Sequence, residues 1–132
     1  IQSRGITVDG CFVLGLDNTF SESFNDVSQF VKTSGLYDVQ ITIMTPFPGT
    51  PLYDRLHQEG RILEEGAWEL CTLFDVNFRP DKMSSKELED GFRDLAENLY
   101  SEEATHSRHN HFRQQFRRSL RSRQPVEQDE IV

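Results

Sequence analysis

The chain has only two cysteines and no long apolar run. Cys11 and Cys71 stand sixty positions apart among 132 residues, so the sequence holds neither a disulfide framework nor the closely spaced thiolates of a metal-binding motif. No apolar stretch approaches the roughly 20 residues that a membrane-spanning helix needs. These absences favour a domain from a reducing, cytoplasmic compartment.

Positive charge is scarce except near the C-terminus. Residues 1–104 hold 8 basic and 19 acidic side chains, whereas residues 105–124 hold 6 arginines and no acidic residue. Nucleic acids attract basic surfaces through their phosphates. The formal net charge of −8 therefore argues against general nucleic-acid affinity, and no nucleic-acid partner is expected.

Proline is also scarce, but three of the five prolines lie in the run TPFPGTP, residues 45–51. This composition excludes a helix or a central strand. The run follows a short apolar segment, residues 39–44, that is typical of a buried strand. Thr50 is predicted to cap a helix that begins at Pro51. A strand therefore ends in a stiff loop and leads into a helix, and ligands of parallel α/β folds bind at that carboxyl edge.

A similar unit precedes it. Residues 6–14 are rich in apolar and β-branched side chains, which predicts a strand, and residues 15–18 break it. Thr19 and Glu22 fit a capping box, so a helix is predicted over residues 20–34, with Gly35 as its C-terminal cap. We expect residues 6–14 and 38–44 to form adjacent parallel strands joined by this helix. The fold class is α/β.

These residues resemble the radical S-adenosylmethionine (SAM) enzymes. Residues 10–17, with Thr19 and Glu22, are similar to the fifth-strand region of that family, and residues 45–53 to the loop after its sixth strand. Residues 78–101 resemble the helical extension of members that carry an N-terminal cobalamin-binding domain. The resemblance covers roughly residues 5–120 and implies the C-terminal portion of a partial (β/α) barrel with parallel strands, followed by a helical extension.

The resemblance also implies an activity. The parent enzyme would reduce SAM at a 4Fe–4S cluster and use a 5′-deoxyadenosyl radical for C–H activation or, with cobalamin, methyl transfer. The family's CxxxCxxC cluster motif is absent, so the fragment alone is expected to be inactive, with no catalytic residue and no metal ligand. The resemblance assigns cofactor binding to residues of the two loops: Gly15, Asp17, Thr45, Pro46, Pro48 and Gly49. The expected partners are the rest of the parent polypeptide, with its cluster-binding barrel half and a cobalamin domain, and a small-molecule or lipid substrate.

Two loop residues have specific expectations. Gly15 would let the backbone approach a ligand, on which a side chain would intrude. Asp17 could accept hydrogen bonds from a ligand hydroxyl or serve only as a turn or cap residue. A non-catalytic α/β interaction module is the alternative function for the whole chain.

Four segments are expected. They are the last barrel strands and helices (residues 1–60), a linker that can hold an extra strand (61–83), the helical extension (84–121) and a disordered tail (122–132). In the extension, Ser84 and Glu87 fit a capping box, and an apolar stripe recurs at helical spacing. The stripe consists of Leu88, Phe92, Leu95 and Leu99.

The basic segment 106–123 places Phe112, Phe116 and Leu120 on one helical face. It predicts either an RNA-contacting or anionic-membrane helix, or a terminal helix packed on the acidic body. Packing is the favoured interpretation. Other side chains are interpreted as structural rather than functional: Cys11, Trp68 and Phe74 in the core, and His106, His109 and His111 as solvated or arginine-adjacent residues rather than metal ligands.

Overall fold

The computed structural model describes residues 1–122. The predicted disordered tail lies outside these residues except for Ser122. The elements follow in the order η1 (Gln2–Arg4), β1 (Asp9–Leu14), α1 (Glu22–Ser34), β2 (Asp38–Ile43), α2 (Pro51–Gln58), η2 (Trp68–Leu70), α3 (Ser85–Tyr100) and α4 (Glu102–Arg121).

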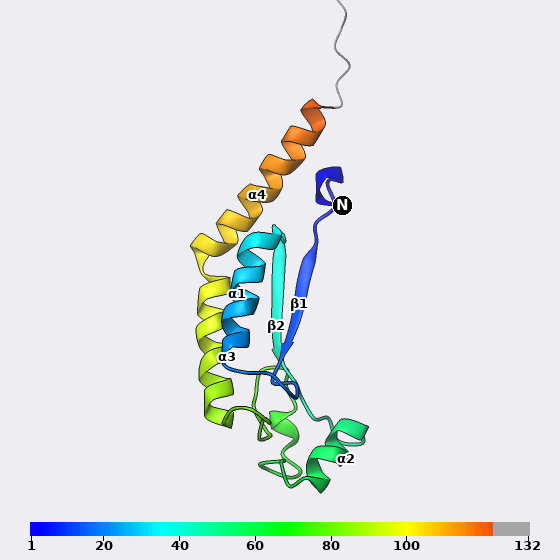
Figure 1. The fold of residues 1–132 in the computed structure, drawn as a ribbon. Coiled ribbons are helices and arrows are strands. Elements are labelled where there is room, and N and C mark those ends of the chain that lie inside the picture. Colours follow the sequence, from blue (N-terminus) through cyan, green and yellow to red (C-terminus); the bar gives the residue numbers. More distant parts are fainter. Residues whose placement is uncertain (123–132) are drawn as a thin grey trace, which may run out of the picture.

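Strands β1 and β2 lie side by side and are parallel, which confirms the predicted pairing. The register runs from Asp9 opposite Asp38 to Leu14 opposite Ile43, and α1 joins the strands as the crossover helix (Figure 1). The fold class is therefore α/β. Within residues 1–122 the sheet is two-stranded.

One face of the sheet carries the core. Alternate strand residues point to opposite faces, and Leu14, Val39, Ile41 and Ile43 are buried. Helices α1 and α3 lie together on one side of the strands (Figure 1). The apolar stripe of α3 joins this core: Leu88, Leu95 and Leu99 are buried and Phe92 packs against them.

Most helix boundaries follow the predicted signals. The Thr50 side chain accepts a hydrogen bond from the Tyr53 amide, Ser84 and Glu87 form a complete capping box, and Gly35 caps α1 with a φ of 70°. The capping box at Thr19 and Glu22 is wrong. The Thr19 amide instead donates to the Leu16 carbonyl, which closes a turn.

Because of this turn, the helix begins later in the chain than predicted. Helix α1 begins at Glu22, and its N-cap residue Ser21 makes no capping hydrogen bond through its side chain. Asn18 has a φ of 64°, so the backbone is not yet helical there. The first two residues of the predicted helix, Phe20 and Ser21, are therefore not part of α1.

The outer edge of β2 is occupied by the chain itself. The Ile43 amide donates to the Leu73 carbonyl at 2.8 Å, and the Ile41 amide donates to the Tyr100 hydroxyl at 3.1 Å. The extra strand considered for residues 61–83 is present only as one antiparallel bridge between Ile62 and Phe78. Irregular chain and a tyrosine thus close this edge without forming a further strand.

The basic segment is helical up to Arg121 and packs on the N-terminal part of the chain. The Phe112 ring lies 5.1 Å from the Tyr37 ring, edge to face, and the Phe116 ring packs against Gly5 in the turn after η1. This contact favours the packing interpretation for the apolar face. Among residues 1–122, no helix is both long enough and apolar enough to cross a bilayer.

Candidate functional site at the carboxyl rim of the sheet

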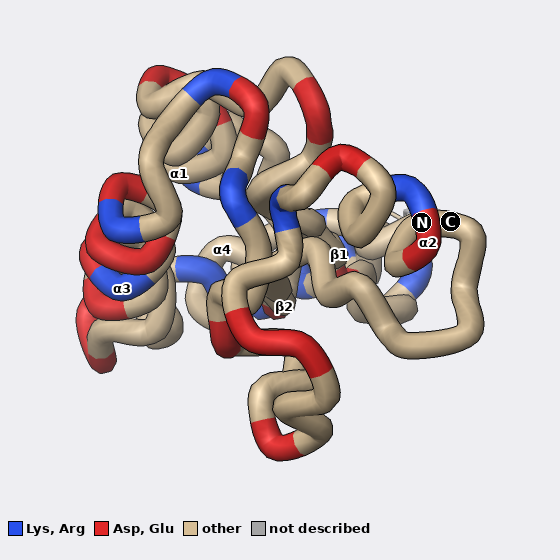
Figure 2. Tube along the Cα trace, turned by 90° about the horizontal axis from the view of Figure 1, so that it is seen from below, with Lys and Arg blue, Asp and Glu red and all other residues tan. Residues whose placement is uncertain are grey.

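The parallel register places both predicted loops at one end of the sheet. Leu14 pairs with Ile43 at the last position of each strand, and the Met44 amide then donates to the Leu14 carbonyl at 2.8 Å. Residues 15–18 and 45–49 therefore leave the sheet together. We call this end the carboxyl rim. Figure 2 views the molecule from this end, with acidic positions spread over α3 and the loops.

Gly15 is held by the chain's own core. It is buried and has a φ of +85°, and a Cβ atom there would lie 2.8 Å from a methyl carbon of Leu88 and 3.0 Å from the Phe78 ring. A side chain would therefore meet the helical extension first. Glycine at this position has a structural cause, because L side chains rarely adopt this backbone conformation.

The second loop has a fixed base and an open tip. Thr45 is 8% exposed, and its hydroxyl donates to the Thr72 carbonyl at 2.6 Å. Pro46 is buried as well. Phe47 is 42% exposed, and a Cβ atom on Gly49 would have no neighbour within 4 Å. The tip can therefore contact a ligand without rearrangement of its base.

Asp17 is the charged centre of the rim. Its carboxylate accepts hydrogen bonds from Arg55 of α2 and from Arg61, the latter at 3.2 Å. Arg61 also pairs with Glu59 at 2.9 Å and donates through Nε to the Arg79 carbonyl. This network joins the first loop to α2 and to the segment that follows it.

The arginines also set the protonation of the rim. The hydrogen bond from Arg55 lowers the pKa of the Asp17 carboxyl; partial burial opposes this effect, and Arg61 adds to the lowering. Partial burial acts to lower the pKa of Arg61, but its hydrogen bonds to Glu59 and Asp17 outweigh this and raise it. Asp17 is thus an anion between two cations. A ligand hydroxyl would have to share the carboxylate with both arginines.

Among residues 1–122, no helix covers the second face of the sheet. Cys11 and Val13 are exposed, as is Gln40, and Thr42 is half-buried; Cys11 lies opposite Gln40, and Val13 opposite Thr42. The interpretation of Cys11 as buried is therefore wrong, because strand alternation turns it away from the core. Parallel sheets normally have both faces covered, whereas within residues 1–122 this sheet is covered on one face.

Two aromatic residues also differ from expectation. Trp68 is 69% exposed and Phe74 is 60% exposed, although both were interpreted as core anchors. Both lie between α2 and α3: Trp68 begins the short helix η2, and Phe74 follows Leu73, whose carbonyl accepts a hydrogen bond from the Ile43 amide at the carboxyl end of β2. Neither side chain is therefore part of the buried core.

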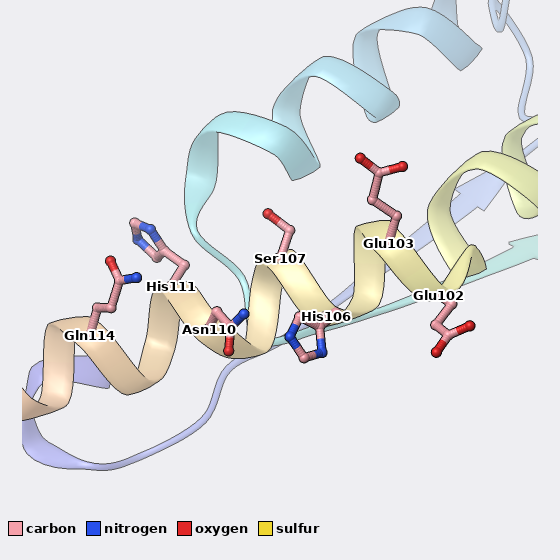
Figure 3. Close-up of a pocket in the computed structure, with 7 residues that line it drawn as sticks. All are labelled: Glu102, Glu103, His106, Ser107, Asn110, His111 and Gln114. Atoms are coloured by element: carbon pink, nitrogen blue, oxygen red, sulfur yellow. The ribbon is translucent and has the colours of Figure 1, made fainter.

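The described residues do not fit an iron–sulfur cluster. Within residues 1–122, no three histidine, cysteine or acidic side chains converge to hold a metal ion, and both cysteines are free. The histidines of α4 diverge: His109 stacks on Tyr37 at 4.2 Å, and Figure 3 shows His106 and His111 on different sides of the helix. The pocket in Figure 3 lies along α4, away from the carboxyl rim.

Comparison with known proteins identifies the second half of the chain. A family model described as "Domain of unknown function (DUF4070)" matches residues 50–131. The chain belongs to this family. DUF4070 is a domain found in cobalamin-binding radical SAM enzymes, which confirms the predicted family resemblance. The matched region begins at Thr50, the N-cap of α2, so β1 and β2 precede the DUF4070 segment.

Two curated relatives extend the match. The chain is 25% identical over 100 residues to the bacteriochlorophyllide d C-12(1)-methyltransferase of Chlorobaculum tepidum, and this alignment covers 76% of this chain and 21% of that protein. It is 37% identical over 65 residues to the hopanoid C-2 methylase of Rhodopseudomonas palustris, and this alignment covers 49% of this chain and 12% of that protein. The chain spans about a fifth or less of the length of these relatives.

Sequence reasoning located the loops but missed three parts of this site. Arg55 and Arg61 were not assigned to it, although Arg61 lies in a stretch that matches the family. The open sheet face was also missed. The signal for it was present, since Gln40 and Thr42 alternate with the buried Val39, Ile41 and Ile43.

Proposed function

We propose that this chain is the C-terminal part of a radical SAM methyltransferase that transfers a methyl group to a carbon atom of a lipid or similar small molecule. The observation that carries the proposal is the shared carboxyl rim of two parallel strands, joined to a DUF4070 segment. Both relatives are named for methylation, one at the C-12(1) position of a bacteriochlorophyllide and the other at the C-2 position of a hopanoid.

The edges of the sheet support a partial barrel as its context. The Leu73 carbonyl and the Tyr100 hydroxyl occupy amides on the outer edge of β2. Within residues 1–122, no strand pairs with the outer edge of β1. We therefore propose that the preceding strands of the parent enzyme pair with β1 and that β2 ends the sheet.

This arrangement gives the open sheet face a role. Because α1 and α3 cover the other face, Cys11, Val13, Gln40 and Thr42 would line the interior of the barrel. A thiol, a carboxamide and a hydroxyl beside a valine can hydrogen-bond a mainly apolar molecule at a few points, which is the usual composition of a small-molecule site. These residues would orient the substrate; the structure assigns none of them to the chemical step.

The rim would hold SAM and exclude water. The six loop residues Gly15, Asp17, Thr45, Pro46, Pro48 and Gly49 remain assigned to the cofactor edge. Asp17, Pro48 and Gly49 would contact SAM, and the buried Gly15, Thr45 and Pro46 would hold the rim in shape. Exposed Phe47 offers an apolar surface, and the prolines leave the loop little freedom to lose on binding. The 4Fe–4S cluster would be bound elsewhere in the parent enzyme, and the cluster would supply the electron that reduces SAM. Cobalamin, as in other members of the family, would bind outside this chain.

The test uses the full-length protein that contains this chain. After anaerobic reconstitution it would be incubated with reductant, a hopanoid or chlorin acceptor, and SAM labelled in its methyl group. We expect release of 5′-deoxyadenosine and label on a carbon atom of the acceptor. Absence of both products from a protein that carries its cluster would favour the non-catalytic interaction module instead.

A matched pair of variants locates the site. Phe47→Ala removes an exposed aromatic surface from the rim, and we expect kcat/KM for SAM to fall roughly tenfold, since an apolar contact of this size contributes on the order of 1–2 kcal/mol. Phe30→Ala removes a comparable exposed ring, 54% exposed on α1, and should leave kcat/KM unchanged. Equal effects of the two substitutions would show that the rim does not contact SAM.

A further inference from the structure

The C-terminal half of α4 carries a cluster of unused positive charge. Arg113, Arg117, Arg118 and Arg121 are all exposed. Within residues 1–122, no ion pair or side-chain hydrogen bond engages any of the four guanidinium groups. We call these four residues the arginine face. Arginines that neutralised the acidic body would have carboxylates beside them, and these do not.

A fifth arginine of the same helix shows the contrast. Arg108 is 8% exposed, donates to the Leu99 carbonyl at 2.8 Å and lies 3.9 Å from the Asp38 carboxylate. The fold therefore uses one arginine of α4 to join the helix to the body. The arginine face contributes nothing comparable to the fold.

The helix geometry separates the arginine face from the packed face. At about 100° per residue, the four arginines span an arc of roughly 140°. Earlier in the helix the same arc contains Glu103, His106, Ser107 and Asn110, and beside the arginines it contains Gln114. Phe112 and Phe116 lie outside this arc and pack on Tyr37 and Gly5. The packed helix thus presents its charges outward, with Leu120, 46% exposed, at the margin of the arc.

We propose that the arginine face binds the anionic surface of a lipid bilayer. The inference rests on the proposed function for its choice of partner, because an enzyme that methylates a lipid must meet its substrate at a membrane. The chemistry fits: guanidinium groups form bidentate hydrogen bonds with phosphate, and clustered basic side chains are attracted to anionic headgroups. The helix lies on the surface and does not insert, because its phenylalanines are engaged within the chain.

Nucleic acid fits this surface less well. Proteins that bind single strands combine basic grooves with exposed aromatic rings on which bases stack, and the two phenylalanine rings of α4 are packed inward. The body of the chain is acidic, with 19 acidic and 8 basic side chains over residues 1–104, and it would repel a polyanion that extends beyond the helix.

The position of α4 defines what the contact does. Helix α4 lies over the amino ends of the strands, and the carboxyl rim lies at their other end (Figure 1). The arginine face therefore attaches the protein to the membrane and does not deliver substrate directly into the rim. Attachment raises the local concentration of lipid at the enzyme surface.

The test is co-sedimentation of the 132-residue chain with vesicles. Phosphatidylcholine vesicles that contain about one-third phosphatidylglycerol should bind the chain, and pure phosphatidylcholine vesicles should not. Arg→Gln substitution at all four positions should lower the partition coefficient on the order of a thousandfold, given the attraction of each basic side chain for an anionic surface. Binding should also be lost at 1 M salt, where the Debye length falls to about 3 Å.

Two control variants distinguish this surface from net charge and from misfolding. Substitution of Arg79, Lys82, Lys86 and Arg93 by glutamine removes the same charge elsewhere and should leave vesicle binding unchanged. Arg→Lys substitution at the four positions of the arginine face should retain it. Circular dichroism checks that each variant is helical.

Three results would overturn the proposal: equal binding to both vesicle types, equal losses in the two glutamine variants, or tighter binding to an RNA oligonucleotide than to the vesicles. None of these readouts depends on SAM or on turnover. Failure here is therefore separable from failure of the proposed methyl transfer.

Discussion

Gly15 tests whether the helical extension and the sheet form one body. The structure places Gly15 at the end of β1 with its missing Cβ directed at Leu88 and Phe78. Gly15→Ala adds one methyl group to this contact. Gly49→Ala is the matched control, because Gly49 lies on the same rim with a φ of +82° and has open space where its Cβ would be.

The expected magnitudes follow from two separate costs. A left-handed backbone conformation costs an L residue about 1–2 kcal/mol, and both variants incur this cost. Overpacking a core contact costs about 1–3 kcal/mol, and only Gly15→Ala incurs it, because its Cβ would lie 2.8 Å from Leu88. Gly15→Ala should therefore lower the free energy of unfolding by about 2–5 kcal/mol, and Gly49→Ala by about 1–2 kcal/mol.

The assay is urea unfolding of the 132-residue chain, followed by circular dichroism. Leu88→Val removes the methyl carbon that the new Cβ would meet, so the double variant Gly15→Ala/Leu88→Val should be more stable than the sum of the single effects predicts, by on the order of 1 kcal/mol. If Gly15→Ala were no more destabilising than Gly49→Ala, the extension would not pack on the rim as the structure places it.

Other substitutions test the remaining contacts. The folded-state pKa of Asp17 is lowered, so the stability that its carboxylate contributes is present above its unfolded pKa of about 3.9 and is lost as the pH falls through the lowered value. The difference in unfolding free energy between wild type and Asp17→Asn, on the order of 1 kcal/mol for a partly exposed network, should therefore disappear in acid. A difference that persists in acid would refute the ionic account. Tyr100→Phe should speed hydrogen exchange at the Ile41 amide, which loses its partner, while the Ile43 amide stays protected; equal exchange at both amides would exclude the closed edge of β2. The isolated chain should retain no stoichiometric 4Fe–4S cluster after anaerobic reconstitution and desalting, because its two cysteines cannot supply three or four neighbouring thiolates; iron and sulfide analysis checks this, and a retained cluster would contradict the assignment of cluster binding to the rest of the enzyme.

Local signals in the sequence predicted much of the fold. These signals each depend on residues close together in the chain: the composition of the strands, the proline-rich loop, the caps at Thr50 and Ser84, and the apolar stripe of α3. The parallel pairing followed as well, because a helix between two short strands leaves few other connections. These features determine the position of the carboxyl rim.

The errors came from contacts between distant residues. The exposure of Cys11 depends on which sheet face α1 and α3 cover, and composition does not report this. Arg55 and Arg61 reach Asp17 from 38 and 44 positions away, so no spacing rule could join them. Trp68 and Phe74 were assigned to the core because tryptophan and phenylalanine are usually buried, but both lie at the surface in the segment between α2 and α3.

The most direct test of the central claim is hydrogen exchange in the full-length protein with and without SAM. Residues 15–18 and 45–49 should exchange more slowly when SAM is bound, because the claim makes both loops the cofactor edge. The amides of α4, at the opposite end of the strands, should not change. Slower exchange elsewhere in the protein with both loops unchanged would contradict the assignment of the carboxyl rim to SAM.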